Sequence, residues 1–525
     1  MTRARVLLPC AAVLLLASPA FAAPRSAPAD LGWADGTADF VVHRWPDPVN
    51  VKNANFFLPN KDVSFPAPGF PLEIERSYNS RSTSDGPLGF GWSFNYDIYV
   101  RVGDDGLPEV VDADGFVCKF LPKGGEGAKN VYEASVNTFI LAKKNADQQG
   151  GVGKPPAFYD SLKQRLMNDP KLLEQLKKEL PNVQAEVNEG SYVSTTRGVQ
   201  TLEVSKQGFR RTFANGITHL FYTMGPDGKA RLRQMIDPAG HSLAMRYTKG
   251  ATGDLVEVSH SDGPALEFTT GKFGKITSAK DPSGKQVFYK YNDRGDLVGF
   301  KDSSGRVTTY DYDEWHNMTK IVFPNGDTIL NKYNSEKDWI LAQKGPGDHL
   351  TSYEYGSDAS DETHYWTVVD EDGVKTRYDY FDAQNRVVIT DSKGNKTDRT
   401  FSECCGKPLQ VIEADGRIVK YEYDKRGNAT RIWDNKGQNI RYEYDPKWNK
   451  VTKVLTPKST TIYQYDNQGN LIQGKDTGAS GLTVKLEYTP DGRVRSVSDD
   501  RGNVFDFKYN AMGKPTQIGP RGGKG

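Results

Sequence analysis

Charge of one sign is the first thing that this sequence lacks. Its 68 basic residues are matched by 67 acidic residues, which leaves a formal net charge of +1. Because nucleic-acid binding relies on neutralising phosphate charge, this balance disfavours a nucleic acid as partner. No basic tract is longer than a few residues, so attraction to a membrane surface is disfavoured as well.

Long hydrophobic runs are missing from all but the first residues. Residues 6–17 form an apolar run behind a positively charged start, and Ala20-Phe21-Ala22 is a small-x-small cleavage site. This pattern is typical of a secretory signal, and the run is shorter than the ~20 residues of a membrane span. Residues 1–22 are therefore predicted to be a signal peptide, cleaved near Ala22/Ala23. The mature chain is expected to have no transmembrane segment and to be extracytoplasmic: secreted, periplasmic or on the cell surface.

Cysteine is scarce, with four residues in the whole sequence. Cys10 lies in the predicted signal peptide, which leaves Cys118, Cys404 and Cys405. In an oxidising compartment, an odd number leaves at least one thiol unpaired or intermolecular. Cys404 and Cys405 could form a vicinal disulfide, pair with Cys118, or do neither. They stand where a turn belongs, and we interpret them as part of a turn, because a metal site needs a fuller set of ligands.

Signatures of catalysis are absent. The sequence has no G-x-S-x-G elbow, no phosphate-binding G-x-x-x-x-G-K-[ST] loop and no H-E-x-x-H motif. Recurrent Asp-x-x-Gly turns lack the close-packed oxygen ligands of an EF-hand. The seven histidines are scattered: His43, His219, His241, His260, His316, His349 and His364. We therefore predict a protein that is not an enzyme, with no catalytic, cofactor-binding or metal-binding residue and no cofactor.

What the sequence does contain is clearest between Gly416 and Gly437. Val419, Tyr421 and Tyr423 alternate with charged residues, a period of two that places the apolar residues on one face of a strand. Asp and Gly in the segment 424–427 indicate a turn, because Asp bonds its own backbone and Gly accepts a positive φ. A second short strand and an Asp-x-x-Gly turn follow. The stretch therefore predicts a β-hairpin.

This hairpin pattern recurs along most of the chain. Consecutive repeats are 21 to 25 residues apart; for example, Tyr423 to Tyr444 is 21 and Tyr222 to Tyr247 is 25. Such a period indicates one supersecondary unit that buries its apolar face by stacking on its neighbours. The second aromatic of the unit falls at Tyr222, Tyr247, Phe268, Tyr291, Tyr312, Tyr333, Tyr355, Tyr380, Phe401, Tyr423, Tyr444, Tyr465, Tyr488 and Tyr509.

The Tyr-Asp pairs, such as Tyr423-Asp424 and Tyr444-Asp445, resemble the YD repeat of the RHS family. The resemblance covers roughly residues 210–515. It implies an all-β fold in which a long antiparallel sheet of stacked hairpins spirals into a shell, as in toxin-encapsulating RHS proteins, insecticidal toxins and teneurins. With fourteen repeat positions the chain is short for enclosing a protein cargo, so a partial shell is expected.

Residues 46–97 carry a second resemblance. The segments Pro71–Ser80 and Gly86–Trp92 look like the domain that opens RHS cores. In the first, Leu72, Ile74 and Arg76 alternate as in a strand, and the second is a tight turn that delivers a large aromatic side chain. We expect this element to cap the first exposed sheet edge, with Trp92 in the core and not in a ligand site.

A helical pattern interrupts the strands between Pro155 and Gly190. The spacing of its apolar residues predicts one helical face, which Pro170 and Pro181 divide into two helices. We interpret Lys123–Ser191 as an insertion that either packs on the shell or forms a plug or partner-binding lid. The residues of the apolar face are Phe158, Leu162, Leu166, Leu173, Leu176 and Leu180.

The predicted organisation has five parts. They are a signal peptide (1–22), an opening element (23–122), a helical insertion (123–191), the repeat sheet (192–515) and a flexible tail (516–525). After Tyr509 we find none of the terminal core motif, autoproteolytic aspartate site or toxin that the resemblance to toxin-carrying members would imply.

Three functional classes follow. The first is a non-enzymatic scaffold or partial shell that binds or encloses a partner protein. The second is a carbohydrate-binding surface protein that uses exposed Tyr and Trp residues. The third is an RHS-type toxin-delivery component without its own effector. A sheet edge is a template for pairing with another chain, so we expect the last repeats, Tyr465–Tyr509, to hold a partner or a second copy.

Overall fold

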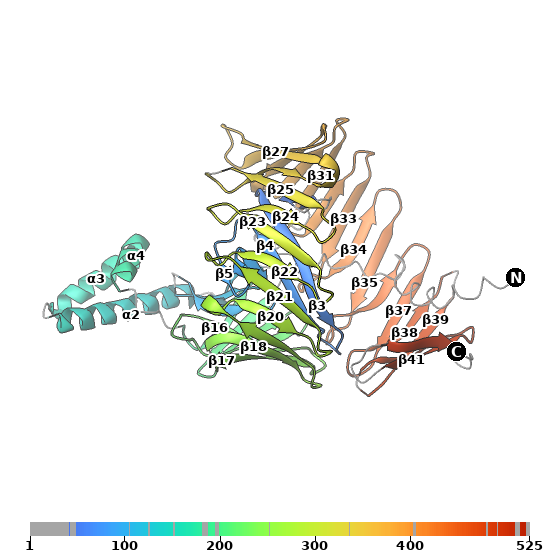
Figure 1. The fold of residues 1–525 in the computed structure, drawn as a ribbon, viewed down its shortest axis with the longest axis horizontal. Coiled ribbons are helices and arrows are strands. Elements are labelled where there is room, and N and C mark those ends of the chain that lie inside the picture. Colours follow the sequence, from blue (N-terminus) through green and yellow to red (C-terminus); the bar gives the residue numbers. More distant parts are fainter. Residues whose placement is uncertain are drawn as a thin grey trace.

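A computed structural model gives the fold of the chain (Figure 1). In the view of Figure 1 the strands rise from β17 to β27 and descend through β33 to β41, so the sheet follows a curve. The structure describes residues 41–42, 49–103, 106–123, 127–150, 153–180, 187–194, 199–250, 252–334, 336–402, 406–478, 481–490, 492–509 and 515–520. The predicted signal peptide, Cys404 and Cys405 lie outside these ranges.

The first seven strands form a small five-stranded sheet and a separate two-stranded one. Five of them pair in the order β1-β2-β3-β4-β7, and β5 pairs with β6. Their bounds are β1 Val41–Val42, β2 Val49–Asn50, β3 Asn55–Phe65, β4 Leu72–Asn79, β5 Asp85–Gly86, β6 Gly89–Phe90 and β7 Trp92–Phe94.

The other 35 strands, β8 to β42, belong to one large antiparallel sheet. From β11 to β42 each strand pairs with the next, and β8 also pairs with β16. The first half comprises β8 Tyr99–Val102, β9 Pro108–Val111, β10 Val117–Lys119, β11 Leu121–Pro122, β12 Gly190–Ser194, β13 Gln200–Ser205, β14 Gly208–Phe213, β15 Thr218–Phe221, β16 Ala230–Ile236, β17 Ser242–Lys249, β18 Thr252–His260, β19 Ala265–Thr270, β20 Ile276–Lys280, β21 Gln286–Tyr291, β22 Leu297–Lys301, β23 Val307–Tyr312, β24 Met318–Val322 and β25 Thr328–Tyr333.

The second half of the sheet continues the same hairpins. The predicted antiparallel sheet over the repeats is confirmed. Its strands are β26 Ile340–Lys344, β27 Leu350–Ser357, β28 His364–Glu371, β29 Val374–Phe381, β30 Arg386–Thr390, β31 Lys396–Phe401, β32 Pro408–Ile412, β33 Ile418–Tyr423, β34 Ala429–Asp434, β35 Asn439–Tyr444, β36 Val451–Leu455, β37 Thr460–Tyr465, β38 Leu471–Asp476, β39 Thr483–Tyr488, β40 Val494–Asp499, β41 Val504–Tyr509 and β42 Pro515–Pro520.

The repeated tyrosine links each hairpin to the one before it. Tyr312 ends β23 and pairs with Met318 after a shift in register. The carbonyl oxygen of Met318 then accepts a hydrogen bond from the hydroxyl of Tyr333, the equivalent tyrosine of the next repeat, at 3.1 Å. The bulge therefore leaves a carbonyl for the following tyrosine to satisfy. The same bond is made by Tyr291, Tyr312, Tyr355, Tyr423, Tyr444, Tyr465, Tyr488 and Tyr509.

The aspartate after the tyrosine organises the turn. One carboxylate oxygen of Asp424 accepts the backbone N–H groups of Arg426 and Asn428, at 2.9 and 2.8 Å. The turn then needs a left-handed residue, which Gly427 supplies with φ of +79°. His316 occupies the equivalent position with φ of +68°, so it replaces a turn glycine there.

The small N-terminal sheet packs against one face of the large sheet, which we call the inner face. Trp92 is 2% exposed, and its indole N–H donates to the hydroxyl of Tyr312 at 3.0 Å. The hydroxyl of Tyr78 donates to the carbonyl of His316 at 2.8 Å. Trp92 is thus a core residue, as predicted. The expectation that this element caps a sheet edge is wrong, because its apolar residues need a whole face to cover them.

A buried ion pair lies in this contact. The Nε atom of Arg76 is 2.6 Å from Oδ2 of Asp62, and both side chains are at most 2% exposed. The hydroxyl of Tyr289 also donates to Asp62, at 2.8 Å, while Nη2 of Arg76 donates to the hydroxyl of Tyr310 at 3.1 Å. Burial alone would lower the pKa of Arg76, but the Asp62 carboxylate raises it above its ordinary value.

The helical segment contains three helices, α2 Gly127–Gln149, α3 Pro156–Asn168 and α4 Pro170–Glu179. The two predicted helices correspond to α3 and α4, whereas α2 was not predicted. All three share a separate apolar core formed by Val136, Phe139, Leu166, Leu173 and Leu176. They extend away from the sheet as an arm (Figure 1), which does not fit the first of the two alternatives, packing along the shell. No helix in the described ranges is long and apolar enough to cross a membrane.

The C-terminal segment differs from the sequence analysis. Residues 516–520 were assigned to a tail but belong to β42, which pairs with β41 through Ile518 and Phe507. Pairing with β41 provides the backbone hydrogen bonds that make this segment a strand, which its Pro- and Gly-rich sequence does not suggest. Cys118 is fully buried, and its Sγ atom lies 3.4 Å from Oδ2 of Asp112.

Candidate functional site

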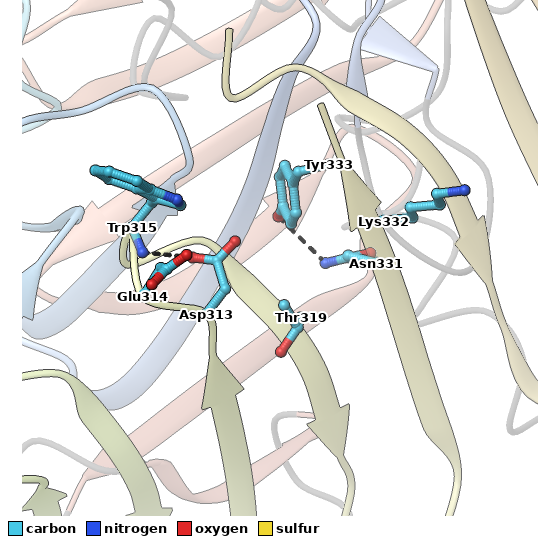
Figure 2. A pocket seen from close by; sticks show the side chains of 7 residues that line it. All are labelled: Asp313, Glu314, Trp315, Thr319, Asn331, Lys332 and Tyr333. Carbon is cyan, nitrogen blue, oxygen red and sulfur yellow. Dashed lines mark hydrogen bonds between the residues drawn. The ribbon is translucent and has the colours of Figure 1, made fainter. Parts of the chain in front are cut away.

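A hollow of about 430 Å³ opens where β23 and β25 end and β24 begins. Figure 2 shows the ring of Trp315 on one side of the hollow and Lys332 on the other. Trp315 is 61% exposed, which is unusual for the largest apolar side chain. The lining residues are Asp313, Glu314, Trp315, Thr319, Asn331, Lys332 and Tyr333.

The repeat turn places this tryptophan. One carboxylate oxygen of Asp313 accepts the backbone N–H groups of Trp315 and Asn317, each at 2.9 Å. This fixes the backbone of the turn and holds the ring outside the core. An exposed aromatic face beside the charged groups of Glu314 and Lys332 can stack on a flat ligand and hydrogen-bond its polar groups.

A second hollow, of about 460 Å³, lies on the outer face of β28 to β31. The rings of His364 and Phe381 stack with centroids 4.4 Å apart. Arg377 holds the carboxylate of Asp379 through both of its oxygens, and Arg386 lies 5.3 Å from the Phe381 centroid. Stacked rings and bidentate pairs make this a preorganised surface.

The charges of this second hollow are mostly matched. Burial alone would raise the pKa of Asp379, but hydrogen bonds from Arg377 and His364 lower it below its ordinary value. Arg386 similarly pairs with Asp398, at 2.6 Å. The lowered pKa of Asp379 favours its ionised form, which serves the ion pair with Arg377.

The third feature is the edge of the sheet at β42. Within the described ranges, β42 has a registered strand partner only in β41. Ile518 in this strand is 58% exposed, and Lys508 on β41 is exposed as well. The predicted partner-binding repeats, Tyr465–Tyr509, thus end next to an edge with an exposed apolar side chain.

The histidines that the structure describes do not form a cluster. Among the described residues, no group of three or more His, Cys, Asp or Glu side chains is arranged to hold a metal ion. Several histidines instead pair with one aspartate each, such as His241 with Asp237 at 2.9 Å and His349 with Asp372 at 2.7 Å. His43 lies outside the described ranges.

Sequence reasoning did not single out Trp315 or the surface around His364. A signal for Trp315 is present, because a tryptophan in a repeat turn has no strand neighbour to pack on. No such signal exists for the second hollow. Its residues alternate outward on four strands, and only the pairing of those strands brings them together.

Three sequence profiles match the chain. A profile described as RHS Repeat matches residues 291–328, and one described as Teneurin YD-shell matches residues 381–521. The chain is an RHS/YD-repeat protein. Its N-terminal part matches a domain of unknown function, DUF6531, over residues 46–120, the region of the small sheet and its connection to the large one. The resemblance drawn from the Tyr-Asp pairs is confirmed.

Solved structures give weaker likenesses. The crystal structure of a TcdB2–TccC3–Cdc42 complex shows 11% identity and a TM-score of 0.38, and the match covers 88% of this chain and 24% of that chain. The Tc holotoxin pore of Photorhabdus luminescens shows 10% identity and a TM-score of 0.26, with 89% and 36% covered. The RHS/YD-repeat chain thus spans about a quarter to a third of their length. No curated protein matches the sequence.

Proposed function

We propose that this RHS/YD-repeat chain is a non-enzymatic scaffold, a partial shell that holds a partner protein at its C-terminal edge. The observation that carries the proposal is β42, which among the described residues has a registered strand partner only on its β41 side. An unpaired strand presents N–H and C=O groups that another chain can extend. Ile518, 58% exposed on that strand, adds an apolar anchor.

Capture from the native envelope tests the proposal. The mature protein is purified from its own envelope after crosslinking, and co-purifying proteins are identified by mass spectrometry. Ile518→Lys should abolish the crosslinks made by Lys508, because it places a charge on the apolar anchor. Val307→Lys is the matched control, since Val307 is 47% exposed but lies far along the sheet.

The outcomes separate the functional classes. Loss of a partner in Ile518→Lys alone supports the proposed edge. A strictly monomeric protein in which Lys508 forms no crosslinks would contradict the proposed partner-binding edge. Co-purification of a small toxic protein would favour a toxin-delivery role without an effector of its own, and turnover of a glycan or peptide would move the chain into an enzyme class.

The Trp315 hollow supports a second candidate, carbohydrate binding. A sugar ring can lie on the exposed indole while its hydroxyls bond to Glu314 and Lys332 at the rim. Binding to a glycan array should then be lost in Trp315→Ala. It should persist in Phe273→Ala, which removes another aromatic side chain, 80% exposed. Equal binding by both variants would reject the hollow as the site.

The proposed location is extracytoplasmic. It rests on the signal pattern of residues 1–22 and on the cleavage motif at Ala20–Ala22. N-terminal sequencing of the exported protein should find a start at Ala23 or within a residue or two of it. Exported material that still begins at Met1 would contradict this proposal.

A further inference from the structure

The second hollow, on the outer face of β28 to β31, has an apolar floor. Val388 lies at its centre in the strand pairing, opposite Asp379 on β29 and opposite Asp398 on β31. Its short side chain lies among longer ones, which leaves a depression of about 460 Å³. Phe381 also lines this hollow. A volume of this size suits a small organic molecule.

One row of outward side chains along the hollow is positively charged at both ends. Arg377 on β29 pairs with Thr390 on β30, and Thr390 pairs with Lys396 on β31. Since neighbouring strands lie ~4.8 Å apart, the two cations flank a hydroxyl group with their backbones about 10 Å apart. Two basic groups and a hydroxyl donor are the groups that hold a carboxylate.

This row carries a positive charge that the protein does not match. Both arginines that line the hollow pair with an aspartate, at 2.7 and 2.6 Å. Among the described residues, no carboxylate pairs with Lys396, and the hydroxyl of Thr390 makes no hydrogen bond. With His364 counted as neutral, three cations against two carboxylates leave one positive charge in excess. The unmatched charge therefore lies beside an unused hydroxyl donor.

Arg377 is held in place from two sides. Its Nε and Nη2 atoms donate to the carboxylate of Asp379, and its guanidinium lies 4.6 Å from the centroid of the Trp366 ring. Trp366 in turn lies against Gly356 of β27, where a Cβ atom would collide with the ring. The Nη1 group of Arg377 makes no hydrogen bond within the described ranges. A donor that is fixed before binding loses little entropy when a ligand arrives.

The equivalent row in other repeats has a different character. At β33 to β35 the same positions hold Lys420, Trp433 and Asn439. A tryptophan takes the place of the hydroxyl there, and no cation stands at the far end. At β25 to β27 the row has a single cation, Lys344, between two leucines. Two cations around a central hydroxyl are therefore a property of β29 to β31 and not of the repeat.

We propose that the second hollow binds a small ligand with a carboxylate group on an apolar body. The carboxylate lies between Arg377 and Lys396 and accepts a hydrogen bond from the hydroxyl of Thr390. The apolar body lies on Val388 and reaches Phe381. A free organic acid and the C-terminus of a peptide both present this chemistry. The inference rests on neither the C-terminal edge nor the first hollow.

Titration of the full mature chain with phenylacetate tests the site, and phenylacetamide is the uncharged ligand of the same shape. Saturation-transfer NMR measures both affinities. The amide should bind about tenfold more weakly, because it lacks the charge-assisted hydrogen bonds of the carboxylate. Equal binding of acid and amide would overturn the proposal.

The peptide Ala-Ala-Phe distinguishes the two sources of the carboxylate. Binding tighter than that of phenylacetate would assign the carboxylate to a peptide terminus, and weaker binding would assign it to a free acid. If neither phenylacetate nor the peptide binds, the proposal is wrong.

Variants locate the binding. Lys396→Ala should weaken phenylacetate binding about tenfold, since it removes the unmatched charge. Thr390→Val keeps the shape of the side chain and should weaken binding less. Lys420→Ala removes another exposed lysine from the outer face; it is the matched control and should bind as the unchanged chain does. The melting temperatures of all three variants show whether they fold. Unchanged affinity in Lys396→Ala, or an equal loss in Lys420→Ala, would contradict the assignment.

Discussion

The hydroxyl of Tyr444 donates a hydrogen bond to the carbonyl oxygen of Ala429, 2.8 Å away. Ala429 is the residue that pairs with Tyr423, the equivalent tyrosine one repeat earlier, across a shift in register. In most repeats the tyrosine therefore satisfies the carbonyl that the preceding bulge would leave without a strand partner. This relation explains why the chain repeats a tyrosine and not merely an apolar residue.

Tyr444→Phe should lower the free energy of unfolding by ~0.5–1.5 kcal/mol, because one hydrogen bond is lost and a carbonyl is left unsatisfied. Arg441→Ala on the exposed side of the same strand is the control and should change it by less than about 0.5 kcal/mol. Denaturant unfolding measures both. Phe268 and Phe401 at equivalent repeat positions indicate that the variant will fold.

Removal of one partner of the buried ion pair should be far more damaging. Arg76→Ala leaves the Asp62 carboxylate buried, and breaking such a pair costs ~3–5 kcal/mol. Arg246→Ala breaks a pair with Glu257 in which the arginine side chain is 63% exposed; it should cost less than about 1 kcal/mol. Equal losses of melting temperature would contradict the assignment of Arg76 to the core.

Alkaline titration of the buried tyrosines should proceed in two stages, first those that ionise in the folded protein and then those that ionise only on unfolding. Burial raises the pKa of Tyr444, Tyr463 and Tyr488 to about 12, whereas an unfolded tyrosine titrates near about 10. Since the folded value is higher, these neutral phenols stabilise the fold fully below about pH 10, and that stabilisation is lost as pH rises through about 12. Tyrosinate absorbance should show Tyr312 and Tyr333 ionising only on unfolding.

The helical arm should be separable from the sheet. Replacing residues 124–189 with a short Gly/Ser linker keeps the pairing of β11 with β12, and loop closure changes by only ~0.6 kcal/mol per doubling of length. The melting temperature should therefore hardly change. A longer deletion that also removes β12, with its buried Tyr192, should destabilise the fold. If the shorter deletion fails to fold, the arm belongs to the sheet.

The period of two in each hairpin was sufficient to assign faces. Leu72, Ile74 and Arg76 alternate in the sequence, and all three are at most 1% exposed. That a charged residue could remain on the buried face was not predictable, because its partner Asp62 comes from another strand. Helix α2 was not predicted, because its apolar residues Val136 and Phe139 can be recognised as core residues only from their packing against α3 and α4.

The sequence by itself determined the local unit: Tyr ends a strand, Asp fixes the turn, and the repeat length makes hairpins stack. These features depend on backbone geometry within about twenty residues, so they are visible in the order of residues. Only the tertiary structure decided which repeats lie beneath the N-terminal sheet, where the sheet edge falls and which outward side chains meet. Those depend on the curvature of the whole sheet, which brings together residues more than two hundred positions apart, such as Arg76 and Tyr310.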